Sequence, residues 1–118
     1  MQSAGYCHRL SWDLRQAIHS LEQALELLQR TSGSVVELSL AYNALGVCQY
    51  NGCDFARATE SLSMALKLAQ GMGDDSRVSL TASNLGALNL IVGKLDEAIR
   101  HCLFAIEVGR AAIGAQPT

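Results

Sequence analysis

Proline and aromatic residues are scarce in this chain of 118 residues. Its one proline, Pro117, stands next to the C-terminus, and phenylalanine, tryptophan and tyrosine together make up 5% of the sequence. Because proline interrupts helices, a chain that is about half apolar and free of internal proline can form long helices. The composition therefore predicts an all-α protein, long enough to bury about two thirds of its unfolded surface around one core.

Charge is sparse as well, with 9 basic and 11 acidic side chains and a formal net charge of −2. Binding of nucleic acid requires a basic face, and no dense run of lysine and arginine provides one. The uncharged stretches 38–53 and 78–93 are interrupted by polar residues and are shorter than the roughly twenty residues that span a membrane. Residues 1–9 lack the apolar run of a secretory signal. We therefore expect no nucleic acid, no membrane and a cytoplasmic location.

Sequence motifs of catalysis are missing too. The chain has no glycine-rich phosphate loop, no nucleophile elbow and no paired carboxylates in an apolar setting. His8 follows Cys7 and His101 precedes Cys102, but neighbouring residues of a helix point about a hundred degrees apart and do not readily hold one metal ion. We expect no enzyme activity, no cofactor and no metal site.

The four cysteines do not have the spacing of a disulfide scaffold. Cys7 and Cys48 each stand two residues after a glycine, and Cys102 takes a place that leucine holds elsewhere in the chain. These three positions predict small core residues, and Cys53, in a turn, is expected to be the most exposed. The pattern favours unpaired cysteines and a reducing compartment.

What the chain does have is an internal repeat of about forty residues. Glycines at positions 5, 46 and 86 are each followed, twelve residues later, by an alanine, and a second alanine comes seven residues after the first. The alanines are Ala17 and Ala24, Ala58 and Ala65, Ala98 and Ala105. A fixed period in this range predicts a solenoid, in which each repeat buries its apolar face against its neighbours.

Each repeat divides into two helices. Apolar residues at helical spacing predict second helices over about 13–30, 54–71 and 95–111, with Asp54 as an N-cap and Gly71 and Gly73 at a helix end. First helices are predicted over about 34–51 and 75–92, and over about 2–9 only in the leading repeat. Gly46 and Gly86 fall in mid-helix, where glycine costs about 1 kcal/mol, so we expect close helix packing there. The first repeat is short, as in a fragment of a longer array or an abbreviated repeat.

The pattern resembles the tetratricopeptide repeat, in an extended variety of about forty residues. Leu45, Gly46, Phe55, Ala58, Leu62 and Ala65 carry the resemblance in the second repeat, and Leu85, Gly86, Gly93, Leu95, Ala98 and Ala105 in the third. It implies an all-α solenoid of about two and a half repeats: one domain over 1–112, with repeats at about 1–33, 34–73 and 74–112, and a tail at 113–118. Five full helices and a short N-terminal one are expected.

The first helices have no charged residue between Glu37 and Asp54, or between Arg77 and Lys94. A helix that is apolar on most sides is normally buried on most sides, so something should cover the outward face of these two. By resemblance, first helices line a concave groove. The predicted partner-binding residues are Gln2, Tyr6, Arg9, Leu40, Asn43, Val47, Tyr50, Leu80, Ser83, Ala87, Leu90 and Ile91.

Two functions fit this groove. The first is capture of a peptide or helix of a partner protein, by a non-catalytic module of a larger scaffold or regulatory protein. The alternative is self-association through the groove and the uncapped ends of the array, because exposed apolar patches tend to be covered. Some tetratricopeptide domains bind the acidic C-terminus of a chaperone through lysines, an arginine and asparagines on their first helices. Here only Arg9 and Asn43 or Asn84 could contribute, so we do not expect that ligand.

Overall fold

The chain folds into helices alone over the residues that the computed structural model describes, 12–31 and 33–114. The five helices are α2 (Trp12–Arg30), α3 (Val35–Asn51), α4 (Phe55–Met72), α5 (Asp75–Ile91) and α6 (Leu95–Gly114). The expected all-α class and the five full helices are confirmed. The short helix predicted over 2–9 lies outside the described residues.

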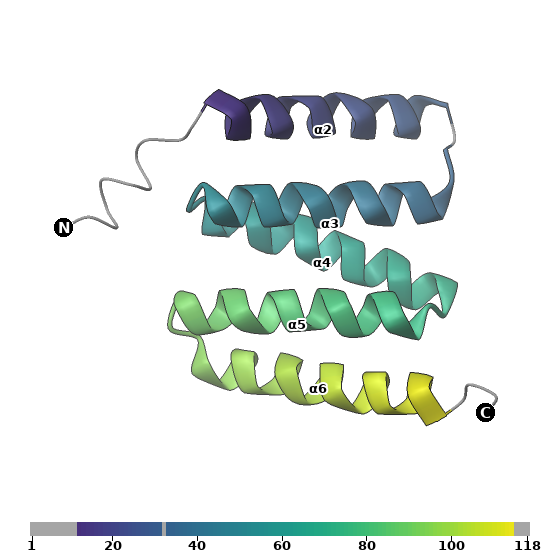
Figure 1. The fold of residues 1–118 in the computed structure, drawn as a ribbon, viewed down its shortest axis with the longest axis vertical. Coiled ribbons are helices and arrows are strands. Elements are labelled where there is room, and N and C mark those ends of the chain that lie inside the picture. Colours follow the sequence, from purple (N-terminus) through teal and green to yellow (C-terminus); the bar gives the residue numbers. More distant parts are fainter. Residues whose placement is uncertain (1–11, 32, 115–118) are drawn as a thin grey trace.

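Helices that follow one another in the chain lie side by side. α3 packs most extensively on α4 and α5 on α6, whereas the contacts between α2 and α3 and between α4 and α5 are less extensive. Figure 1 shows the resulting row, from α2 at one end to α6 at the other, with α4 behind α3 and α5. α3 and α5 also touch each other directly. The described part is thus a repeat-like array of helix pairs.

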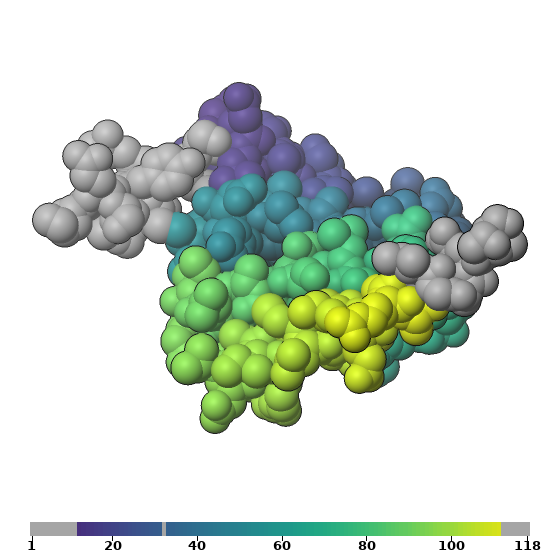
Figure 2. Space-filling model, turned by 60° about the horizontal axis from the view of Figure 1, so that its bottom comes forward, coloured from purple at the N-terminus to yellow at the C-terminus, as the bar shows by residue number. Residues whose placement is uncertain are grey.

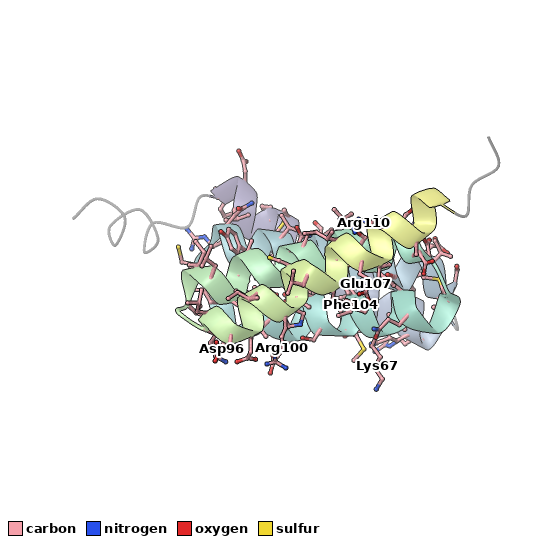
Figure 3. The ribbon with its side chains drawn as sticks, turned by 90° about the horizontal axis from the view of Figure 1, so that it is seen from below. Lys67, Asp96, Arg100, Phe104, Glu107 and Arg110 are labelled. Carbon is pink, nitrogen blue, oxygen red and sulfur yellow. The ribbon has the colours of Figure 1, made fainter. Side chains whose placement is uncertain are left out.

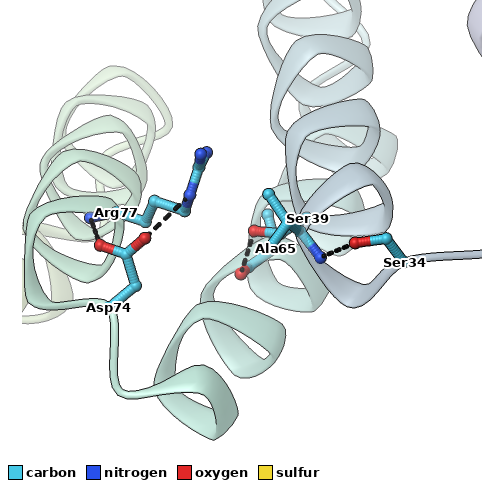
Figure 4. A network of polar contacts seen from close by, with 6 residues as sticks. Ser34, Ser39, Ala65, Asp74 and Arg77 are labelled. Carbon is cyan, nitrogen blue, oxygen red and sulfur yellow. Dashed lines mark hydrogen bonds and ion pairs between the residues drawn. The ribbon is translucent and has the colours of Figure 1, made fainter.

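Local capping fixes where the helices begin and end. The Asp54 and Asp74 carboxylates accept hydrogen bonds from the backbone N–H groups three residues on, at the starts of α4 and α5. Asp74 also pairs with the Arg77 guanidinium, Nε to Oδ2 at 3.0 Å (Figure 4). At the other end of α4 the prediction was partly wrong. Gly71 is still helical, and Gly73 ends the helix in the left-handed conformation at φ 71°.

Small residues let the paired helices approach closely, as the sequence predicts. Ala58 and Ala65 of α4 are fully buried, and Ala98 and Ala105 of α6 are nearly so. A Cβ atom placed on Gly46 would lie 2.7 Å from Leu62 Cγ, closer than carbon atoms pack. The mid-helix glycine is therefore required by the contact between α3 and α4.

Two apolar clusters form the core. One joins α4 and α5 through Ala58, Leu62, Leu85 and Leu88, and the other joins α2 and α3 through Leu25, Ala41 and Leu45. The alanines of α2 depart from the pattern of the later repeats, since Ala17 is half-buried and Ala24 is exposed.

Two hydrogen bonds recur at the repeat distance of forty residues. The Ser39 hydroxyl donates to the Ala65 carbonyl oxygen at 3.4 Å, and the equivalent Ser79 hydroxyl donates to the Ala105 carbonyl oxygen at 2.8 Å (Figure 4 shows the first). Each links the first helix of a pair to the second. The two pairs, α3 with α4 and α5 with α6, are therefore built alike in detail.

A second recurring link is polar and buried, and the sequence pattern does not predict it. The Ser61 hydroxyl donates to Gln49 Oε1 at 2.7 Å between α4 and α3. Forty residues on, Asn89 Nδ2 lies 3.0 Å from His101 Nδ1 between α5 and α6. Gln49 and Asn89 are 5% and 4% exposed. Buried amides need partners, and these pairs provide them inside the helix contacts.

The cysteine predictions were partly wrong. Cys102 is exposed rather than part of the core, and Cys53 is half-buried rather than the most exposed. Cys48 and Cys102 carry free thiols, as expected, but Cys53 is disulfide-bonded. Burial raises the pKa of the Cys48 thiol. Cys7 lies outside the described residues.

Candidate functional site

The candidate site is the outward face of α3 and α5, which carries apolar side chains in helical register. Leu40 and Val47 of α3 are 47% and 38% exposed, and Leu80 of α5 is 55% exposed. Leu90 and Ile91, at the end of α5, are also largely exposed. The opposite sides of the same helices supply buried core residues. Both helices are therefore apolar on their solvent side as well as inside.

A hollow of about 240 Å³ lies in this face. It is lined by three of the predicted residues and three others: Val47, Tyr50, Ala87, Asn51, Leu62 and Asn84. Leu62 comes from α4, behind the two first helices, and the other five come from α3 and α5. The hollow thus opens between the first helices of adjacent repeats and reaches the core.

The walls of the hollow are held in place by contacts on both sides. The Tyr50 ring packs edge-on against Phe55, with ring centroids 5.8 Å apart and an interplanar angle of 71°. Across the face, Asn84 Nδ2 donates a hydrogen bond to Asn43 Oδ1 at 3.2 Å and links α5 to α3. The remaining amide groups of Asn43 and Asn84 make no other hydrogen bond to described residues. Their remaining donors and acceptors can form further hydrogen bonds.

The remaining predicted residues fall around the hollow or outside the described part of the chain. Ser83 and Ala87 are exposed on α5, and Asn43 and Tyr50 are half-buried on α3. Gln2, Tyr6 and Arg9 lie outside the described residues. Leu62 was named only as a residue of the repeat pattern, whereas sequence reasoning missed Asn51 as a lining residue and noted Asn84 only in connection with the chaperone clamp. Both lie at helical spacing from Asn43 and Ala87, which is the signal that could have found them.

The described residues give little support for a metal site or a membrane-spanning segment. They contain no group of three or more histidine, cysteine, aspartate or glutamate side chains placed to hold a metal ion. His101 is occupied in the core contact with Asn89 and also lies 3.0 Å from the Glu97 carbonyl oxygen. None of the described helices is both long and apolar enough to cross a membrane.

No protein-family model matches the chain, and no curated protein has a matching sequence.

Proposed function

We propose that this chain is a non-catalytic interaction module that binds a peptide or helix of a partner protein along the face of α3 and α5. The observation that carries the proposal is the hollow of about 240 Å³ between these two helices. It lies in an apolar, uncharged face and has unused amide groups beside it. Large apolar side chains that remain in water at one place on a soluble chain favour an interaction surface.

The proposed function depends on a particular arrangement of the helices. We propose that the array is a solenoid of the extended tetratricopeptide type, with α3 and α5 as the groove-lining first helices. The hydrogen bonds from Ser39 and Ser79 support this, because they recur at the sequence period of forty residues and join equivalent helices. So do Gly46 and Gly86, which both lie at close helix contacts. A repeat that is regular in its contacts as well as in its sequence favours stacked units.

The shape and chemistry of the hollow indicate the type of ligand. Its volume is smaller than the range of about 300–1,000 Å³ that is usual for small-molecule sites. It suits a single apolar side chain inserted from a peptide, while the rest of the peptide lies along the exposed leucines. The Asn43 and Asn84 amides can then bind backbone N–H and C=O groups of the same peptide.

The proposal is tested by selecting peptides from a random displayed library on the purified chain and measuring their affinity by fluorescence polarisation. Ala87→Glu puts a carboxylate at the hollow, and Leu90→Glu removes an apolar contact beside it. We expect each to weaken binding at least tenfold. Met64→Glu, on an exposed part of α4, is the matched control and should bind like the unaltered chain. Binding that survives both substitutions would overturn the groove assignment, as would a selection that yields no peptide.

Membership of a larger scaffold or regulatory protein is part of this proposal, and so is the cytoplasmic location, although the disulfide at Cys53 counts against a reducing compartment. Self-association remains the second candidate function, and one observation favours it. The outer side of α6 is also apolar and exposed, and it is a different surface from the hollow.

A further inference from the structure

The outer side of α6 carries a second exposed apolar surface. Leu95, Ile99, Leu103 and Ile106 are 57%, 48%, 61% and 56% exposed. Their spacing of four, four and three residues places them along one stripe of the helix. Figure 2 shows α6, in yellow and yellow-green, on the outside of the molecule at the C-terminal end of the array. We call these four residues the α6 stripe.

Comparison with the preceding repeat indicates how the equivalent side of a second helix is covered. Leu95 and Ile106 correspond, forty residues earlier, to Phe55 and Leu66 of α4, whereas Ile99 and Leu103 take the places of the polar residues Thr59 and Ser63. Phe55 and Leu66 pack against the cluster that contains Leu85 of α5, so a helix covers this side of α4. No described helix covers the same side of α6. The α6 stripe therefore has the composition of a helix-packing surface and faces solvent.

The charges beside the α6 stripe indicate which helix fits it. The exposed charged side chains of α6, Asp96, Arg100, Glu107 and Arg110, alternate in sign along the helix (Figure 3), whereas Glu97 is half-buried. A second α6 laid parallel would bring each charge next to its own kind. A second α6 laid antiparallel with its centre near Leu103 brings Asp96 opposite Arg110 and Arg100 within one residue of Glu107, in both directions. The order of these four exposed charges is thus complementary to the same order read in reverse.

We propose that α6 packs antiparallel against α6 of a second copy of this chain, with a two-fold axis near Leu103. The two Leu103 side chains meet at the centre, Ile99 of each chain lies near Ile106 of the other, and the four charge pairs flank the apolar contact. A two-fold contact of this kind uses the same surface on both subunits and closes at the dimer. It leaves the hollow between α3 and α5 free, so the two proposals can fail separately.

Sedimentation equilibrium over a series of concentrations tests the dimer. The unaltered chain should reach the mass of two copies, and Leu103→Glu should raise the dissociation constant at least a hundredfold, because it places two carboxylates at the centre. Leu27→Glu is the matched control, since Leu27 is also 61% exposed but lies on α2. It should leave the mass unchanged. Far-UV circular dichroism establishes that each variant keeps its helix content.

Charge exchange tests the antiparallel register. Arg100→Glu alone and Glu107→Arg alone each set like charges opposite one another at two symmetric places, and each should raise the dissociation constant about tenfold. The double variant restores opposite charges and should return to within about twofold of the unaltered chain. Any one of three results overturns the proposal: a monomer at every concentration, association that persists in Leu103→Glu, or a double variant that is as weak as the single ones.

Discussion

Replacing Gly46 by alanine adds one methyl group where α3 lies closest to α4. The new Cβ would lie 2.7 Å from Leu62 Cγ and 2.8 Å from Leu62 Cδ2, whereas carbon atoms in contact are about 3.5–4.0 Å apart. Leu62 is 1% exposed and packs against Leu85 and Leu88, so it cannot turn away without moving them. Overpacking costs up to about 3 kcal/mol, and alanine regains about 1 kcal/mol of helix propensity. We expect a net destabilisation of about 2 kcal/mol.

The repeat supplies a matched comparison at Gly86. There the nearest atom to an added Cβ is Cys102 Sγ, at 2.6 Å, and the next lie at 3.4 Å. Because Cys102 is exposed, its sulfur can rotate into solvent. Gly86→Ala should therefore lie between no change and a gain of about 1 kcal/mol. Gly71→Ala, in α4 with nothing within 4 Å of the added methyl, should be stabilised by about 1 kcal/mol.

Urea unfolding followed by far-UV circular dichroism measures these differences. A double-mutant cycle with Leu62→Ala assigns the cost to the contact, because Gly46→Ala should stop being destabilising once the leucine side chain is gone. Equal effects of Gly46→Ala and Gly86→Ala, or a Gly46→Ala penalty that persists beside Leu62→Ala, would refute this account of the helix contact.

Two further predictions concern buried side chains. Ser61→Ala leaves Gln49 Oε1 buried without its partner and should lower the free energy of unfolding by about 1–3 kcal/mol. The control Ser63→Ala, at an exposed site of α4, should change the free energy of unfolding by less than about 0.5 kcal/mol. Similar urea midpoints for the two variants would count against the buried hydrogen bond between Ser61 and Gln49. Iodoacetamide at neutral pH should modify Cys102 before Cys48, because burial raises the pKa of the Cys48 thiol and lowers its thiolate fraction. Raising the pH should speed the labelling of Cys48, which is followed by mass spectrometry of peptides. Equal labelling rates of Cys48 and Cys102 at neutral pH would contradict the burial of the Cys48 thiol.

Features that depend on neighbouring residues could be predicted from the sequence. The start of α4 was located to within a residue, because the Asp54 carboxylate that caps it is adjacent in sequence. The close contact at Gly46 was predicted because a glycine in mid-helix has a known cost that packing offsets. Both inferences need only local chemistry and the repeat.

Features that depend on what lies across a helix contact were missed. Cys102 takes the place of a leucine in the repeat pattern, but the helix that covers that place on α4 has no counterpart on α6 among the described residues, so the thiol is exposed. The Gln49 amide has no feature in the sequence that predicts its burial. Its partner Ser61 is twelve residues away, and only the packing of α3 on α4 brings them together.

The uneven packing along the array has a mechanical consequence. Within each pair, the first and second helices share a broad contact, while the joint between α4 and α5 is narrower. Bending should therefore concentrate at that joint, and the hollow spans it, since its lining comes from both sides. We expect the distance between α3 and α5 to adjust as the joint bends, so that the proposed peptide site could accept peptides of different width without unfolding either pair.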